Sequence, residues 1–189
     1  MNFTTAKRIL NSHISTLEAT FDSKNIELID RTITFIKRTI DKNGIVYTCG
    51  NGGSASEADH LSGELIGRFN KNREPIKSLN LATGLGSLTC IGNDFGYEHI
   101  FSRPANALLN ENDSLIMYST SGRSINIKNA AMVAINKKAT SILITGNNKE
   151  DWHNDLELVI RIKSQDTAII QECSLVITHM ICEEIDNDY

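Results

Sequence analysis

The chain has 189 residues, a formal net charge of −4 and four cysteines. This length suits one domain with a single core, and the scattered basic residues lack the clustered footprint of a nucleic-acid-binding protein. The cysteines show no CxxC or zinc-finger spacing, the first residues lack the apolar stretch of a signal peptide, and no apolar run approaches the roughly 20 residues that span a bilayer. We therefore expect a cytoplasmic protein without membrane or nucleic-acid partners.

Residues 5–43 carry two successive apolar stripes with helical spacing, the first around Ile14 and Leu17 and the second around Ile33 and Ile36. The sequence therefore predicts an N-terminal pair of helices, ended by Asn43-Gly44, before any strand. Their apolar stripes must be buried either against the chain's own sheet or against another subunit, and the pattern leaves both open.

The rest of the chain alternates between short apolar runs and helical patterns. The expected strands lie at 45–49, 78–82, 115–118, 141–145 and 156–162, and the expected helices lie at 54–69, 98–110, 124–138 and 166–186. This alternation predicts an α/β fold, a three-layer αβα sandwich with a five-stranded parallel sheet over residues 44–189. The polar segment 147–155 is interpreted as a surface loop.

A serine-rich segment follows the third expected strand and precedes a helix. Its hydroxyl residues are Ser119, Thr120, Ser121 and Ser124, grouped around Gly122. Compact hydroxyl donors and free amides at the positive end of a helix suit a phosphate group, although Ser124 alone could simply cap that helix.

A glycine-rich segment follows the first expected strand and includes Asn51, Gly52, Gly53 and Ser54. It also matches G-x-G-x-x-A, but no acidic residue stands at the end of the second expected strand, where a dinucleotide-binding fold holds the ribose. We interpret it as a close backbone approach to a smaller phosphorylated substrate.

His60 and Glu64 are four residues apart on the helix after this segment, so they share one face. Gln171 and His179 lie eight apart on the last expected helix, about 80° apart around its axis. Each pair alone could be a solvated helix pair or a core histidine. Together, beside a phosphate site, they could form a four-ligand metal cluster or an acid–base pair.

With these residues in place, the sequence resembles the phosphoheptose isomerases of the sugar isomerase (SIS) domain superfamily. The resemblance extends over nearly the whole chain and rests on the segments at 49–54, 60–68, 91–96, 101–103, 119–122 and 170–172 and on His179. It implies one SIS domain over residues 1–189 and a cytoplasmic homotetramer, with the helices of residues 1–43 at subunit contacts.

The resemblance also implies a reaction, conversion of sedoheptulose 7-phosphate to D-glycero-D-manno-heptose 7-phosphate for nucleotide-activated heptose of lipopolysaccharide or capsule. It implies one zinc ion per subunit, held by His60, Glu64, Gln171 and His179, with Glu64 and His179 catalytic. The substrate-binding positions that it implies are Asn51, Gly52, Gly53, Ser54, Glu64, Asn93, Asp94, Ser119, Thr120, Ser121, Ser124 and Gln171.

Two departures from the family pattern bear on specificity. Ala168 and Ile169 stand where relatives commonly have polar residues, and Arg123 adds a cation near the expected phosphate. Two alternatives remain open at this stage, a non-catalytic SIS domain that binds a sugar phosphate and regulates, and an isomerase of a pentose or hexose phosphate.

Overall fold

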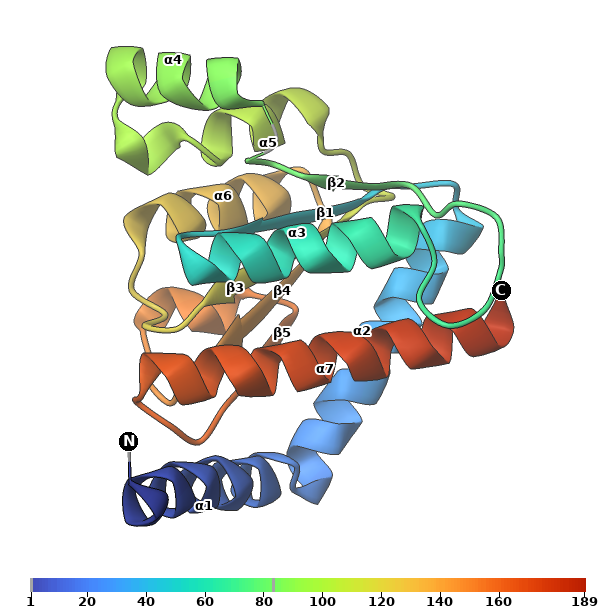
Figure 1. Ribbon diagram of the computed structural model, residues 1–189. Helices are drawn as coiled ribbons and strands as arrows, with labels where there is room; N and C mark the ends of the chain where they lie inside the picture. Colours follow the sequence, from blue (N-terminus) through green and yellow to red (C-terminus); the bar gives the residue numbers. More distant parts are fainter. Residues whose placement is uncertain (1, 83) are drawn as a thin grey trace.

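The computed structural model describes residues 2–82 and 84–189, in which helices cover both faces of a single sheet (Figure 1). The strands are β1 (Val46–Gly50), β2 (Ser78–Asn80), β3 (Ser114–Ser119), β4 (Thr140–Thr145) and β5 (Leu158–Arg161). The helices are α1 (Phe3–Thr20), α2 (Ser23–Asp41), α3 (Gly53–Ile66), α4 (Leu85–Phe95), α5 (Ser102–Leu108), α6 (Ile125–Asn136) and α7 (Thr167–Asp188), with 3-10 turns η1 (Tyr97–His99) and η2 (Asp151–Asp155).

All five strands are parallel, in the order β2-β1-β3-β4-β5. The chain moves outward from β1 to β2 and then returns to the other side of β1 with β3. The sheet order therefore reverses between β1 and β3, and loops diverge there beyond the carboxyl ends of the strands. The predicted five-stranded parallel sheet, preceded by two N-terminal helices, is confirmed.

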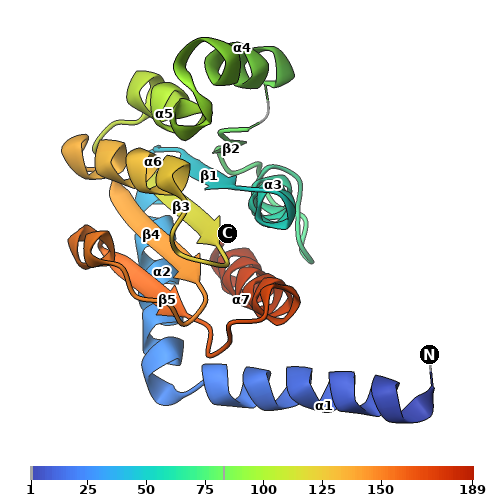
Figure 2. The ribbon, with the colours of Figure 1, turned by 90° about the vertical axis from the view of Figure 1, so that its left-hand side faces the viewer.

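Alternate residues of each strand enter two separate cores. Val46 and Ile116 face the cluster under α2, α3 and α7, whereas Tyr47 and Leu115 face the cluster under α5 and α6. Because both faces are covered, β1 and β3 are buried along their whole length, as their continuous apolar sequences predict. Figure 2 shows the two helical layers on opposite sides of the sheet.

Helix α1 projects away from the sheet and runs beside α7 (Figure 2). Its His13 pairs with Glu172 of α7 at 2.6 Å, while its apolar residues Phe3 and Leu10 are 82% and 58% exposed. In the expected stripe of this helix, Ile14 is 44% exposed whereas Leu17 packs against the core, so only the C-terminal part of the stripe is buried within this chain.

Two local expectations were wrong. Helix α4 was not anticipated; none of its residues is fully buried, and only its partly buried Leu88 and Ile91 pack against the core cluster under α5 and α6. Segment 147–155 is no simple surface loop, since η2 buries Trp152 and His153. No helix among the described residues is long and apolar enough to cross a membrane.

Candidate active site

A small polar hollow opens where the adjacent strands β1 and β3 end. Its lining residues come from both loops and from the end of β3 and are Asn51, Ser54, Tyr118, Ser119, Thr120 and Ser124. Parallel strands bring their carboxyl ends to one edge, so segments about 70 residues apart meet here. Five of the six lining residues were predicted to bind substrate; Tyr118 was not.

Ser124 occupies the position before α6, yet its side chain makes no capping hydrogen bond. Its Oγ instead lies 3.5 Å from Ser119 Oγ, with both residues lining the hollow. The simple capping interpretation therefore does not account for Ser124. Ser121 differs, because it does not line the hollow and its Oγ accepts the Arg123 amide at 3.2 Å.

Asn51 is held in place by two neighbours. Its side-chain amide forms a reciprocal pair with Asn126, at 2.9 and 2.8 Å, and Tyr97 donates its hydroxyl to Asn51 Oδ1 at 2.9 Å. Sequence reasoning missed Tyr97, whose segment includes no regular pattern. The next residue, Gly52, has φ +56°, a left-handed conformation that glycine adopts without strain.

His60, Glu64 and His179 meet beside α3 and α7. The Nε2 atoms of His60 and His179 are 3.0 Å apart, and Glu64 Oε1 lies 3.5 Å from His60 Nε2. Phe69 stacks on His179 with ring centroids 5.4 Å apart. The side chains of His60 and Glu64 are 38% and 23% exposed, so solvent or a small molecule can reach them.

Gln171 lies elsewhere on α7, two turns before His179. Its side-chain amide packs on the glycine segment, where a Cβ added to Gly53 would lie 2.2 Å from Gln171 Nε2. The structure thus joins three of the four expected metal ligands and places the fourth at the glycine segment. Within residues 2–82 and 84–189, no group of three His, Cys, Asp or Glu side chains is arranged as a metal cluster.

Asn93 and Asp94 are further expected site residues that do not line the hollow. Both are exposed on α4, where Asn93 Nδ2 donates to Asp94 Oδ1 at 2.8 Å and the Cys90 thiol contacts Asp94 Oδ2. Arg123 is also directed elsewhere, because its Nε pairs with Glu150 Oε1 at 3.0 Å.

Glu57 is a buried carboxyl group that sequence reasoning missed. It lies one turn after Ser54 on α3, is 9% exposed, and neither of its oxygens has a hydrogen-bond partner among the described residues. Burial raises the pKa of Glu57 to about 8, and the Ser54 hydroxyl only partly opposes this rise. The S-x-x-E pattern at the helix start resembles an ordinary capping box, which hides this position in the sequence.

We expect the variant Glu57→Gln to stabilise the protein at alkaline pH. The native carboxyl group keeps its proton up to about pH 8, whereas the carboxyl group of the unfolded chain loses it near the usual pKa of 4.5. The contribution of the protonated Glu57 carboxyl group to the free energy of unfolding is therefore full below pH 4.5 and is lost as pH rises through 8. The stability gain of the variant over wild type should shrink by about 3 kcal/mol between pH 9 and pH 6.

Urea unfolding at the two pH values measures this difference. The exposed residue Glu27 supplies the matched control variant Glu27→Gln, which should show no such change. A pH-independent difference between Glu57→Gln and wild type would contradict a raised pKa at this position.

Comparison with known proteins places this geometry in a family. Residues 10–146 match the family model described as the SIS domain. A phosphoheptose isomerase of Burkholderia pseudomallei (strain K96243) is 42% identical over 149 residues, which cover 79% of this chain and 76% of the relative.

Solved structures agree with the sequence relatives. A phosphoheptose isomerase from Francisella tularensis superposes with a TM-score of 0.93 at 28% identity, covering 99% of this chain and 100% of the other. One from Neisseria gonorrhoeae gives 0.89 at 27% identity, with 97% and 98% coverage. The chain therefore belongs to the phosphoheptose isomerase family of SIS-domain proteins.

Proposed function

We propose that this enzyme converts sedoheptulose 7-phosphate to D-glycero-D-manno-heptose 7-phosphate. The observation that carries the proposal is the juxtaposition on helix α3, which begins beside the hydroxyl-lined hollow and continues to His60 and Glu64. The hollow suits a phosphate, and the imidazole–carboxylate group suits proton transfer at the other end of an open-chain sugar.

Each group has a task in that reaction. Interconverting a 2-ketose and an aldose moves one proton between C1 and C2 and another between O2 and O1, through a cis-enediolate. We assign the carbon-bound proton to Glu64, since one carboxylate can reach both carbons from one face. We assign the oxygen-bound proton to His179, whose Nε2 is 3.0 Å from that of His60.

The phosphate itself is not transformed. It binds to Ser119, Thr120 and Ser124, away from the reacting carbons, and this binding orients the open-chain sugar over Glu64. The substrate-binding roles of Asn51, Gly52, Gly53, Ser54, Ser121, Gln171, Asn93 and Asp94 are part of the same proposal.

A zinc ion is the cofactor that the donor chemistry fits. Tetrahedral zinc ligands at about 2.0–2.1 Å lie roughly 3.4 Å from one another, and the donor atoms of His60 with His179 and with Glu64 are 3.0 and 3.5 Å apart. These three residues would hold the ion, whereas Gln171, the weaker amide ligand of the expected set, lies at the glycine segment instead. When bound, zinc supplies Lewis-acid polarisation of the substrate carbonyl.

Chelation tests the metal proposal. Prolonged dialysis against a strong chelator should lower kcat by at least about 100-fold, and stoichiometric zinc should restore it, because developing oxyanion charge loses its stabilisation. Metal content is measured alongside activity. Full turnover by protein shown to contain no metal would contradict the assignment and leave only acid–base roles for the histidines.

We also propose a homotetramer in which a second copy covers the apolar surfaces near the site. A groove lined by apolar side chains of α2, α7 and Phe69 runs past His179, and α1 exposes a further apolar stripe beside it. Exposed apolar surface of this extent is typical of an interface. Light scattering measures the assembly, and a monomeric active enzyme would contradict it.

Residues 1–189 would form one SIS domain of a cytoplasmic enzyme, whose product enters nucleotide-activated heptose for lipopolysaccharide or capsule. Incubating the protein with C5, C6 and C7 ketose phosphates tests the substrate directly. Conversion of the C7 compound to an aldose supports the proposal. Preferred conversion of a shorter sugar would change the substrate, and binding without conversion would indicate a regulatory SIS domain.

A further inference from the structure

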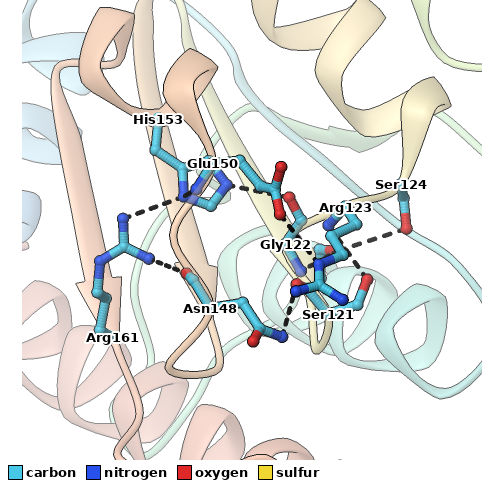
Figure 3. Close-up of polar contacts among 9 residues, drawn as sticks. Ser121, Gly122, Arg123, Ser124, Asn148, Glu150, His153 and Arg161 are labelled. Carbon is cyan, nitrogen blue, oxygen red and sulfur yellow. Dashed lines mark hydrogen bonds and ion pairs between the residues drawn. The ribbon is translucent and has the colours of Figure 1, made fainter.

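The serine-rich loop is supported from behind by segment 147–155 and β5 (Figure 3). His153 of η2 is 3% exposed and reaches the carbonyl oxygen of Gly122 with Nε2, at 3.0 Å. Arg161 at the end of β5 contacts the other ring nitrogen of His153, Nδ1, at 3.0 Å. These contacts join the phosphate hollow to elements that do not line it.

The partners of His153 determine its tautomer. Nδ1 faces the Arg161 guanidinium and the backbone N–H of Glu150, which lies 3.4 Å away. Both groups are donors, so Nδ1 must be the accepting nitrogen. The proton of the neutral ring is therefore on Nε2, and His153 donates it to Gly122.

Gly122 permits this approach because it has no side chain. A Cβ at this position would lie 2.9 Å from both His153 Cε1 and Thr145 Oγ1, and its φ of +67° favours glycine. The Gly122 amide N–H is also engaged, by Ser119 Oγ at 3.2 Å. The backbone of one residue, Gly122, thus connects His153 to a hydroxyl of the hollow.

The preceding carbonyl of the loop is held on the same side. Asn148 donates its side-chain amide to the Ser121 carbonyl oxygen at 3.1 Å, and Arg161 donates to the Asn148 carbonyl oxygen. Carbonyl oxygens repel a phosphate, so a loop that binds one must direct its carbonyls elsewhere. Asn148, His153 and Arg161 do this for two successive residues.

We propose that His153 is a positioning residue for phosphate binding, which as the neutral Nε2–H tautomer holds the Gly122 carbonyl away from the hollow and releases it on protonation. The assignment rests on the proposed function for its substrate, since the phosphate is that of the sugar. Protonation leaves the Nε2–H donor in place but puts a hydrogen on Nδ1 between two donors, Arg161 and the Glu150 amide, with no acceptor to receive it. This repulsion would displace the ring, and the Gly122 contact would be lost with it.

The charges around His153 agree with a neutral ring. Burial lowers the pKa of His153 below its usual 6.5, and Arg161 on β5 lowers it further. The Gly122 carbonyl and the Glu150 carboxylate oppose this, but Glu150 is shared with Arg123 of the serine loop at 3.0 Å. Phosphate binding supported by His153 should therefore be complete above pH 6.5 and weaken as pH falls through the lowered pKa.

Two substitutions test the role. His153→Leu removes the donor and should raise KM for sedoheptulose 7-phosphate roughly 10-fold, with kcat within about 3-fold, as expected for one lost hydrogen bond to a carbonyl. His153→Gln keeps an N–H donor but cannot titrate, so it should keep KM near wild type at pH 7.5. The exposed neighbour Asp151 supplies the control variant Asp151→Asn, which should change neither constant.

The pH profile separates positioning from folding. Between pH 7.5 and the lowest pH at which both proteins stay folded, the ratio of wild-type KM to the KM of His153→Gln should rise, because both respond equally to protonation of the substrate phosphate and only wild type carries His153. A constant ratio would overturn the proposal, as would a folded His153→Leu variant with wild-type KM. If His153→Leu does not fold, the profile of His153→Gln alone decides.

Binding of inorganic phosphate, measured by calorimetry, separates this proposal from the proposed function. A Kd raised about 10-fold in His153→Leu supports the positioning role even if no sugar phosphate is isomerised. An unchanged Kd contradicts it even if the isomerase assay succeeds.

Discussion

Replacing Glu64 by glutamine should lower kcat for aldose–ketose isomerisation by at least about 1,000-fold, because the amide cannot accept the carbon-bound proton. Glu64 lies four residues after His60 on α3, and its side chain retains 23% exposure, so substrate can reach it. The change is isosteric and leaves the hollow untouched.

Measuring phosphate affinity alongside kcat shows whether the fall in kcat comes from lost chemistry or from lost binding. Phosphate affinity, measured as the Kd of inorganic phosphate, should stay within about 3-fold of wild type, since binding and chemistry are carried by different residues. Glu111, exposed before β3 at the opposite end of the sheet, provides the matched variant Glu111→Gln with unchanged kcat. Near-normal turnover by Glu64→Gln would remove Glu64 from the role of base.

The variant Arg73→Met should lower the free energy of unfolding by about 3–5 kcal/mol, since it leaves a buried carboxylate unpaired. Arg73 Nε pairs with Asp186 Oδ1 at 2.8 Å, and the two side chains are only 1% and 2% exposed. Asp186 also accepts the backbone amides of Asn70 and Lys71, at 2.6 and 2.8 Å. Favourable hydrogen bonds keep the pKa of Asp186 low despite burial, so its charge persists.

This pair also connects the two helices of the site. The Arg73 guanidinium donates to the carbonyl oxygens of Glu64 and Leu65 at the end of α3, at 2.8 and 2.9 Å, while Asp186 belongs to α7. Loss of Arg73 should therefore lower kcat as well as stability, because Glu64 and His179 are no longer held together.

Urea unfolding at fixed protein concentration measures the stability, and Arg73→Lys and the double variant Arg73→Met/Asp186→Leu serve as comparisons. The double variant should recover more than half of the lost free energy, since no buried charge remains unpaired. A single variant as stable as wild type would show that Asp186 is not a buried charge in solution.

The sheet could be predicted from the sequence because its strands are buried on both faces. Continuous apolar runs such as residues 115–118 can be recognised as buried strands from the local sequence alone. The two edge strands are shorter than expected, since β2 has three residues where five were expected and β5 has four where seven were expected, and each pairs with one neighbour alone.

The missed elements depend on contacts that one sequence does not display. Helix α4 contributes only the partly buried Leu88 and Ile91 to a core, and the burial of His153 requires β5 and the serine loop to be in place. Polar residues in a segment such as 147–155 are ordinarily solvated, and only the fold shows which of them are not.

The sequence identified most residues of the candidate site, but it predicted less well where they lie relative to one another. Helical spacing placed His60 and Glu64 on one face, and strand ends placed Ser119 and Ser124 beside Asn51. The same reasoning did not separate Gln171 from the histidines. It considered the angle between Gln171 and His179 around the helix axis, but not the two helical turns that separate them along that axis. Asn93 and Asp94 lie on the unanticipated α4, outside the hollow.

The most direct test of one continuous active site is a crystal structure of the Glu64→Gln variant with sedoheptulose 7-phosphate bound. We predict the phosphate within hydrogen-bond distance of the Ser119 and Ser124 hydroxyls, with C1 and C2 of the open chain beside residue 64 and His179. A phosphate bound away from the serine loop, or sugar carbons remote from α3, would contradict the account.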